Sequence, residues 1–245
     1  YRDVESQSPM EMDTLFRIYS MTKPITSVAV LLLAENGEIE LDAPVGDYLP
    51  EMAGLRVYRS SWRWKSPSRA VTVRDLLRHT SGLTYGFFGE GPVDQLYMER
   101  HPLFSANLRE MMTKVAELPL VHHPGEAFTY GISTDVLGAL VERVSGEPFG
   151  LFLKEHLFTP LEMHNTGFYT DNTGRLASVY KSGGELHEAA ADSEFQQQNR
   201  LESGGGGLIS TAGDYLNFCE MLLNNGLFRG KQILQIATVE EMTRN

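Results

Sequence analysis

The sequence predicts a mixed α+β protein in which helices are the majority. Apolar residues recur at helical spacing in two stretches that end in stop signals, residues 25–37 and 136–146, and residues 107–117 can form another helix. The strands that can be recognised are too few to form a self-sufficient sheet. With 245 residues and 42% hydrophobic content, the chain can bury a substantial core in one large domain.

The first of these helices begins near Ser20 or Met21. Pro24 is tolerated only in the first turn of a helix, because its nitrogen cannot donate to the carbonyl four residues earlier. Asn36-Gly37 supplies a stop signal. Ser20 therefore stands at the beginning of a buried helix.

The remaining elements follow from turn and capping signals. Arg56 to Val73 is expected to form a loop or a short hairpin, followed by a capped helix from Thr72 to Arg78. Leu176–Tyr180 and Glu185–Ala189 flank Ser182-Gly183-Gly184 and predict a hairpin. Thr211 with Asp214 predicts the cap of a last helix through Leu223.

Charge and apolar patterning exclude several functions. The formal net charge of -11 repels phosphate backbones and disfavours nucleic acid as a partner. The longest apolar run, Val28–Ala34, is far too short to span a membrane. Cys219 cannot form an internal disulfide and is expected to be a small core residue. We expect a cytoplasmic protein whose N-terminus is incomplete in this sequence.

Ser20 and Lys23 form a Ser-x-x-Lys pattern at the start of the first helix. Residues three apart share a helix face, so the Lys23 amine can accept the proton of the Ser20 hydroxyl. The Ser20 N–H, at the positive end of the helix dipole, can donate to a carbonyl oxygen that becomes anionic. The pattern predicts Ser20 as a nucleophile and Lys23 as its base.

A second Ser-x-x-Lys pair, Ser178 and Lys181, shows that the pattern alone is weak. This pair lies in the predicted hairpin, with no buried helix behind it. We interpret it as a coincidence of spacing.

Several motifs in one order make the sequence resemble the serine β-lactamase-related and penicillin-binding-protein-like hydrolases. They are residues 15–24 (LFRIYSMTKP), 41–45 (LDAPV), 76–83 (LLRHTSGL), 124–133 (Pro-Gly-Glu, then Tyr-Gly-Ile-Ser) and 204–214. The resemblance extends from about Leu15 to Thr243 and is much more specific than any one motif.

This resemblance implies a β-lactamase/transpeptidase-like fold, in which a helical subdomain packs with an antiparallel sheet sandwiched by helices. We expect residues 1–245 to form a single catalytic domain that is truncated at both ends, with a mostly helical subdomain at about residues 45–170. Tyr130 matches the tyrosine that, in this family, shuttles the serine proton to the leaving group together with the lysine. Whether Tyr130 or Lys23 takes the first proton stays open.

The resemblance also implies supporting residues around the site. His79 and Ser81 lie in a His-Thr-Ser-Gly turn that supports it, and they are too close in sequence to form a triad of their own. Gly204 and Gly205 are expected to let the backbone approach the acyl pocket. The glycine run lacks nucleotide-binding spacing, and the histidines lack zinc-ligand spacing, so we expect no cofactor and no metal.

Two departures from the family pattern affect the expected substrate. Ile132 stands where β-lactamases and peptidases of this family carry an asparagine, and isoleucine cannot hydrogen-bond a substrate amide. This favours esters, as in the family VIII carboxylesterases. The third family motif is missing: Lys181-Ser-Gly183 resembles it but precedes residues 204–214, whereas the family's strand follows them. Truncation at Asn245 is the better explanation.

We therefore expect a carboxylesterase that cleaves small acyl esters through a Ser20 acyl-enzyme. A β-lactamase, D-amino-acid peptidase or acyltransferase of the same fold is the first alternative, and a non-catalytic penicillin-recognising or interaction protein is the second. The expected partner is a small-molecule ester, and the sequence does not indicate an oligomeric state.

Overall fold

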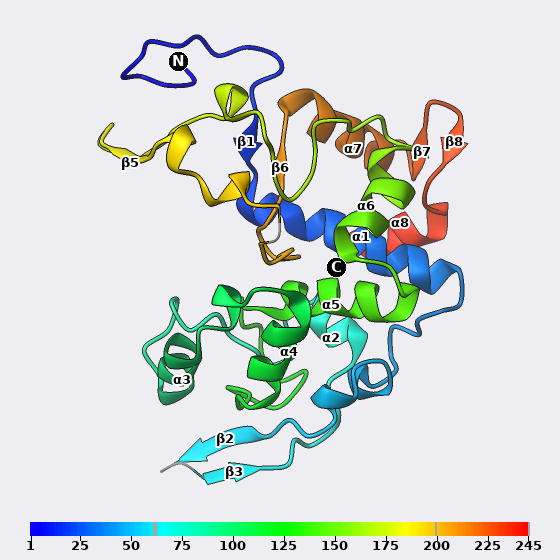
Figure 1. Cartoon of the computed structure of the whole chain (residues 1–245). Helices are drawn as coiled ribbons and strands as arrows, with labels where there is room; N and C mark the ends of the chain where they lie inside the picture. Colours follow the sequence, from blue (N-terminus) through cyan, green and yellow to red (C-terminus); the bar gives the residue numbers. More distant parts are fainter. Residues whose placement is uncertain (61–62, 199, 245) are drawn as a thin grey trace. The chain divides into compact units, whose positions relative to one another are not determined.

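The computed structural model describes residues 1–60, 63–198 and 200–244 (Figure 1). The chain divides into two units, each formed from segments that are distant in sequence. The first unit contains residues 1–22, 150–200 and 207–245, and the second contains residues 23–149 and 201–206. A short return of the chain at 201–206 thus completes the second unit.

The second unit is built mainly from helices whose ends follow local sequence signals. Helix α1 (Thr22–Glu35) follows directly on the 3₁₀ turn η1 (Tyr19–Met21) and carries Pro24 in its first turn, as predicted. Gly37 ends this segment with a φ of +75°. The apolar face of α1 is fully buried at Ile25, Val28 and Ala29.

Capping residues set the bounds of the other predicted helices of this unit. Helix α2 (Val73–Leu77) begins at Thr72, whose side chain forms a reciprocal capping box with Asp75. Asn107 caps α4 (Leu108–Ala116), and Gly146 ends α5 (Ser133–Ser145) in the left-handed conformation. Both α2 and α4 pack against α5. All three helices confirm the sequence predictions.

Two further parts complete the second unit. Of the loop or short hairpin expected at residues 56–73, the structure contains the hairpin, formed by β2 (Val57–Ser60) and β3 (Arg63–Lys65), which pair antiparallel. Helix α3 (Pro92–Arg100) was not predicted from the sequence. Short 3₁₀ turns lie at Val45–Asp47, Pro50–Met52 and Pro102–Phe104.

The first unit contains the remaining strands, all in antiparallel pairs. Strand β1 (Phe16–Arg17) pairs with β6 (Ile209–Ser210), although almost two hundred residues separate them in sequence. A buried apolar cluster in the first unit consists of Leu15, Leu176, Phe195 and Ile209. The other pairs are the predicted hairpin β4–β5 (Val179–Tyr180 and Leu186–Glu188) and β7–β8 (Leu227–Phe228 and Lys231–Gln232).

The helices of this unit are α6, α7 and α8. Helix α7 (Ala212–Leu223) has the predicted Thr211–Asp214 cap. Helix α6 and the π-helical turn η5 are consecutive, and α8 lies near the end of the chain; their bounds are Phe149–Leu153, Lys154–Phe158 and Ile236–Thr243. Further 3₁₀ turns are Thr173–Arg175, Ala190–Asp192 and Glu194–Gln196.

The mixed α+β class with antiparallel strand pairs is confirmed. The expectation that Cys219 is a core residue is wrong: its side chain lies on the exposed side of α7, whereas Phe218 and Met221 face the interior. Apolar neighbours in sequence misled the prediction, because this helix buries only one face. None of the helices in residues 1–60, 63–198 and 200–244 has the length and apolarity that crossing a bilayer requires.

Candidate active site

Ser20, the candidate nucleophile, lies on the exposed turn η1 immediately before α1. Tyr19, the residue before it, has a φ of +42°, a left-handed conformation that costs a non-glycine residue about 1–2 kcal/mol. The next carbonyl, that of Met21, accepts a hydrogen bond from the Tyr215 hydroxyl at 3.1 Å. Ser20 belongs to the first unit, whereas Lys23 and Tyr130 belong to the second.

Lys23, the candidate base, is held by contacts within the second unit. Its Nζ donates to the Gly205 carbonyl oxygen at 2.6 Å. The same nitrogen lies over the ring of Tyr130, 4.7 Å from the centroid, and 5.2 Å from the centroid of the Tyr85 ring. Two tyrosine faces and one carbonyl therefore orient the amine.

A buried carboxylate, Asp135 on α5, fixes the loop that offers this carbonyl. Asp135 accepts hydrogen bonds from the Ser203 hydroxyl, from the Gly205 N–H at 3.0 Å and from the Tyr85 hydroxyl at 3.1 Å. Burial raises the pKa of Asp135, while these donors and the nearby Lys23 charge oppose the rise. Burial also raises the pKa of Tyr85, as does the Asp135 charge, which keeps the Tyr85 hydroxyl protonated as a donor.

Glycine is required at position 205 because its neighbours leave no room for a side chain. A Cβ there would lie 2.3 Å from Asp135 Oδ2 and 2.4 Å from the Tyr85 hydroxyl. At Gly204 a Cβ would lie 2.5 Å from the Thr134 carbonyl oxygen, and the Gly204 carbonyl accepts from Thr26 Oγ1 at 2.8 Å. The glycines thus let the loop approach α1 and α5 closely.

His79 supports the loop that carries Tyr130. The His79 carbonyl accepts from the Thr129 N–H at 2.8 Å, its Nδ1 accepts from the Gly131 N–H at 3.4 Å, and its ring lies 5.1 Å from the Tyr130 ring. Burial lowers the pKa of His79 to about 4, with a smaller contribution from the Lys23 charge. The imidazole is therefore neutral near pH 7.

Ser81 and Ile132 lie inside the protein. The Ser81 hydroxyl is hydrogen-bonded to Ser133 Oγ at 2.9 Å and accepts from the Leu83 N–H at 3.1 Å. Ile132 directly precedes α5 and is 1% exposed, so its side chain packs in the core. Both residues support the start of α5.

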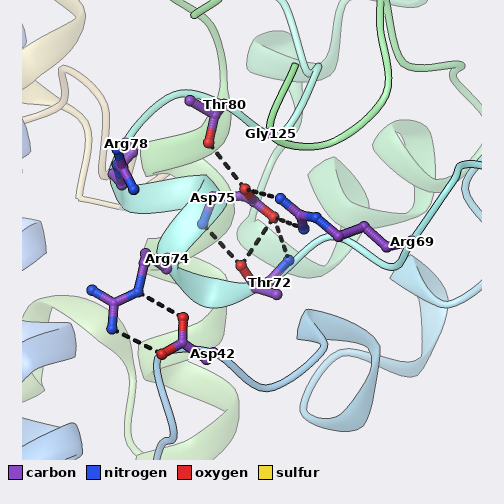
Figure 2. A pocket seen from close by; sticks show the side chains of 8 residues that line it. All are labelled: Asp42, Arg69, Thr72, Arg74, Asp75, Arg78, Thr80 and Gly125. Carbon is purple, nitrogen blue, oxygen red and sulfur yellow. Dashed lines mark hydrogen bonds and ion pairs between the residues drawn. The ribbon is translucent and has the colours of Figure 1, made fainter. Parts of the chain in front are cut away.

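A charged pocket of about 370 Å³ lies around the start of α2 (Figure 2). Asp75 accepts two hydrogen bonds from Arg69 and one from the Thr80 hydroxyl at 3.0 Å. Burial raises the pKa of Asp75, but the hydrogen bonds, those of Arg69 foremost, outweigh it and lower that pKa to about 2. This network ties α2 to the turn after it, where His79 and Ser81 lie.

The second Ser-x-x-Lys pair has separate partners. Ser178 donates to Asp3 Oδ2 at 2.7 Å, whereas Lys181 pairs with Glu185 at 3.1 Å in the β4–β5 hairpin. Lys181, Ser182 and Gly183 are exposed. Neither residue of the pair lies on a helix, so the structure gives this pair none of the surroundings found at Lys23.

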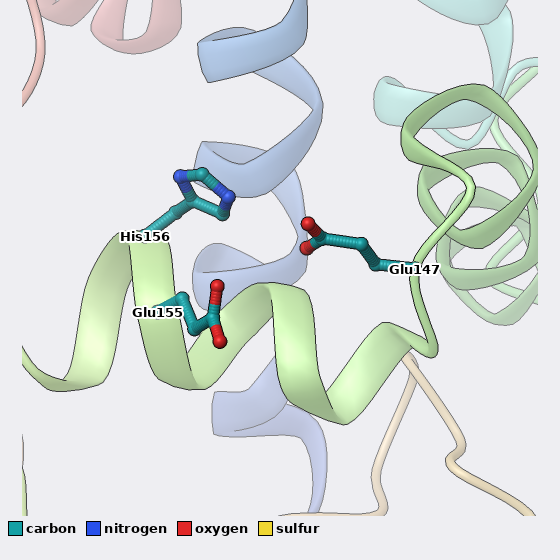
Figure 3. Close-up of side chains that lie close together, drawn as sticks. All are labelled: Glu147, Glu155 and His156. Atoms are coloured by element: carbon teal, nitrogen blue, oxygen red, sulfur yellow. The ribbon is translucent and has the colours of Figure 1, made fainter.

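Figure 3 shows the side chains of Glu147, Glu155 and His156, which are of types that can ligate a metal. Glu147 follows α5 in the second unit, and Glu155 and His156 lie on η5 in the first. The His156 ring packs on Phe152, 4.3 Å between centroids. We assign no metal to these residues.

Sequence reasoning missed two residues of the site, Tyr85 and Asp135. Asp135 lies in the first turn of α5, where a carboxylate ordinarily complements the helix dipole, so its sequence position did not distinguish it. The available signal was a lone acid beside an otherwise apolar helix face. Tyr85 follows a turn and resembles an ordinary packing aromatic.

The chain belongs to the beta-lactamase family, because the family model described as Beta-lactamase matches residues 1–245. Within this family, the chain is similar over most of its length to two further proteins. It is 37% identical to Protein Rv1367c of Mycobacterium tuberculosis over 99% of its length. It is 36% identical to Esterase EstB of Burkholderia gladioli over 91% of its length.

The fold is also that of a solved hydrolase. EstCE1, described as a hydrolase with promiscuous acyltransferase activity, is 30% identical and superposes with a TM-score of 0.84, covering 98% of this chain and 65% of that one. The chain spans 62% of the length of Protein Rv1367c and 60% of that of EstB. The comparisons thus place the chain among β-lactamase-fold relatives that include an esterase and a hydrolase with acyltransferase activity.

Proposed function

We propose that the protein is a serine esterase that cleaves small acyl esters through an acyl-enzyme on Ser20. One observation carries the proposal: Lys23, three residues after Ser20, has its amine held by the Gly205 carbonyl and by the Tyr130 ring. A lysine oriented in this way beside a tyrosine can serve as part of a proton relay. Similarity to Esterase EstB supports the choice of ester chemistry.

The first chemical step forms the acyl-enzyme. The Ser20 oxygen attacks the ester carbonyl carbon, and its proton passes to the relay formed by Lys23 and Tyr130. The Ser20 N–H, at the start of α1, donates to the carbonyl oxygen as it becomes anionic. The relay then gives its proton to the alcohol oxygen as the ester C–O bond breaks.

The second step releases the acid. A water molecule gives its proton to the same relay while its oxygen attacks the acyl carbon, and the proton returns to the Ser20 oxygen as the acyl bond breaks. These two chemical steps need no cofactor, because side chains of the chain transfer each proton and its backbone N–H donors stabilise the developing negative charge.

Ile132 supports esters over amides as substrates. The Ile132 side chain packs in the core and has no polar atom, so position 132 offers no hydrogen bond to an amide of a peptide or a β-lactam. A substrate amide left without a partner when desolvated costs about 1–3 kcal/mol, whereas an ester has no N–H to satisfy. We therefore expect penicillins to acylate Ser20 slowly.

Acyl transfer to an alcohol is the second candidate function. EstCE1, which shares this fold, is described as having promiscuous acyltransferase activity. In this chain an alcohol would replace water in the second step, with the same relay accepting its proton. Product analysis in the presence of an added alcohol distinguishes the two: hydrolysis yields the acid, and transfer yields a new ester.

Intact-mass spectrometry with a fluorophosphonate, followed by peptide mapping, tests the nucleophile. We expect one adduct on Ser20, no adduct in Ser20→Ala, and loss of ester turnover in Ser20→Ala and Lys23→Ala. Tyr130→Phe should be nearly as harmful as Lys23→Ala, because both residues belong to one relay.

Ser178→Ala and Lys181→Ala are matched controls, since they alter the same residue types at the same spacing in the β4–β5 region. These variants should retain full activity. Equal losses in both pairs would overturn the assignment. If the protein hydrolysed no ester and no electrophile labelled Ser20, the result would indicate the remaining alternative, a binding or interaction protein.

A further inference from the structure

Four aromatic side chains form a continuous group beside Lys23 in the second unit. We call this group the aromatic platform, and it consists of Tyr85, Phe87, Phe88 and Tyr130. Phe87 and Phe88 are 54% and 68% exposed, although phenylalanine is ordinarily buried. Adjacent exposed aromatic residues of this kind commonly mark a binding surface.

Each ring of the platform contacts the next one in space. The Tyr85 and Phe87 rings stack with centroids 5.1 Å apart, Phe87 and Phe88 are 4.5 Å apart, and Phe88 lies 5.7 Å from Tyr130. These separations are typical of favourable aromatic pairs. The platform therefore presents an ordered set of ring faces and edges.

Hydrogen bonds and close packing hold the backbone at Thr84 and Gly86, on either side of Tyr85. Gly86, between Tyr85 and Phe87, has a φ of +86°, and a Cβ there would lie 2.7 Å from the Asp94 carbonyl oxygen. Thr84 donates to Asp94 at 2.8 Å and accepts from the Gly86 N–H at 3.1 Å. Such a preformed surface loses little entropy on binding.

We propose that the aromatic platform binds an aromatic group of the ester substrate, so that the preferred substrates are neutral arylalkyl esters. The inference rests on the proposed function and specifies its substrate class. Tyr130 connects the platform to the proton relay, because its ring contacts Phe88 and also lies beneath the Lys23 amine. A ring held against Phe87 and Phe88 would place its ester within reach of the relay.

An aromatic ligand gains more here than a saturated one of equal size. Both bury apolar surface on Phe87 and Phe88, but only a planar ring with its quadrupole can form offset or edge-to-face contacts with them. A neutral ligand also avoids repulsion by the acidic chain, whose formal net charge is -11.

Two ester pairs with matched reactivity test the substrate class. Benzyl acetate is compared with cyclohexylmethyl acetate, and vinyl phenylacetate with vinyl cyclohexylacetate, by kcat/KM. These pairs place the ring on the alcohol side or on the acyl side. We expect a threefold to tenfold preference for the aromatic member of at least one pair, since an aromatic contact has about this effect. The Phe87→Leu/Phe88→Leu double variant should lose that preference.

Phe104→Leu is the control, because Phe104 is an 83% exposed phenylalanine in the same unit whose ring contact is with His101. It should keep the preference of the wild-type protein. Equal rates for both members of each pair, or a preference that survives in the double variant, would overturn the inference while leaving the esterase intact.

A binding measurement separates this inference from the proposed function. Saturation-transfer NMR of benzyl acetate with Ser20→Ala protein requires no turnover. Signal that disappears in the Phe87→Leu/Phe88→Leu background supports the platform even if no ester is hydrolysed. Signal that is absent in Ser20→Ala, or unchanged by the double substitution, contradicts it.

Discussion

Asp135 is the single side chain to which three parts of the candidate site are tied: Ser203, Gly205 and Tyr85. It touches neither Ser20 nor a substrate atom in our proposal, and it acts through Gly205, whose carbonyl holds Lys23. We regard it as a positioning residue. This role predicts an effect on proton transfer that a purely structural residue would not have.

Asp135→Asn should lower kcat about tenfold with little change in KM, because an amide cannot accept from all three donors and the Gly205 carbonyl loses its fixed position. The pH–rate profile should shift as well, since the amine that Gly205 holds belongs to the relay. Steady-state kinetics across pH measure both effects.

Asp214→Asn is the matched control for this prediction. Asp214 is also a buried aspartate that accepts several hydrogen bonds, among them one from the Asn165 N–H at 2.7 Å, but it lies in the first turn of α7 in the first unit. That variant should lose stability and keep its pH profile. An unshifted profile in Asp135→Asn would show that Asp135 serves only the fold.

His79 makes stability depend on pH in a definite direction. Because burial lowers its pKa from 6.5 to about 4, the unfolded chain binds a proton between these values and the folded protein does not. The folded state is therefore favoured above pH 6.5 and loses up to about 3 kcal/mol as the pH falls through 4. Urea unfolding of wild-type and His79→Gln protein from pH 7 to 4 measures this loss, which should be smaller in the variant. Parallel pH curves would contradict it.

Residues of the candidate site could be predicted where a spacing rule applies, and could not be predicted where their contacts depend on tertiary structure. Ser20 and Lys23 were found because they are three apart at a helix start. Gly205 reaches Asp135 and Tyr85 because the chain returns at 201–206, and no local pattern encodes that return.

At the scale of elements, polar caps made the helix bounds predictable. Thr72, Asn107 and Thr211 each accept a backbone N–H three residues later, and the helices begin where these residues stand. Helix α3 was missed because few apolar residues repeat along it, although Gly91-Pro92 followed by Asp94 is a start signal. Strand β1 is two residues long and has no periodicity to detect.

The ion pair between Arg17 on β1 and Glu188 on β5 joins two of these short strands. The Arg17 side chain is 1% exposed, contacts Glu188 at 2.7 Å and donates to the Ala177 carbonyl at 2.6 Å. Glu188→Ala would leave a buried guanidinium without its counter-charge, so we expect a loss of about 3 kcal/mol in unfolding free energy. Urea denaturation measures this change.

Glu185→Ala, at the same hairpin, removes a carboxylate whose partner Lys181 is exposed. It should change the unfolding free energy little, because solvent screens such pairs. If the two variants were equally stable, Arg17 would have to be satisfied without Glu188.

At the scale of the whole molecule, the acidic balance of the chain affects which substrates approach it. An ester that carries a carboxylate should show a kcat/KM that rises several-fold between about 10 and 150 mM salt, because the Debye length shortens from about 30 to about 8 Å. The neutral methyl ester of the same compound is the control and should be insensitive. An identical salt response for both esters would exclude long-range repulsion.

The formation of two units from interleaved segments could not be predicted from chain order. Residues 1–22 pair with segments beyond residue 150, as β1 does with β6, and such pairing leaves no mark in either local sequence. The family motifs indicated the fold class because they specify turns and helix starts. They do not specify which distant segments meet.

The crowding around Gly205 has a consequence for evolving or engineering this protein. Saturation of position 205 should return glycine alone, because any side chain would meet Asp135 and Tyr85. Phe87 and Phe88 are largely exposed, and new side chains there meet few neighbours. Substitutions that change the range of accepted substrates can therefore accumulate at positions 87 and 88, while position 205 stays glycine. A combinatorial library should be diversified at positions 87 and 88.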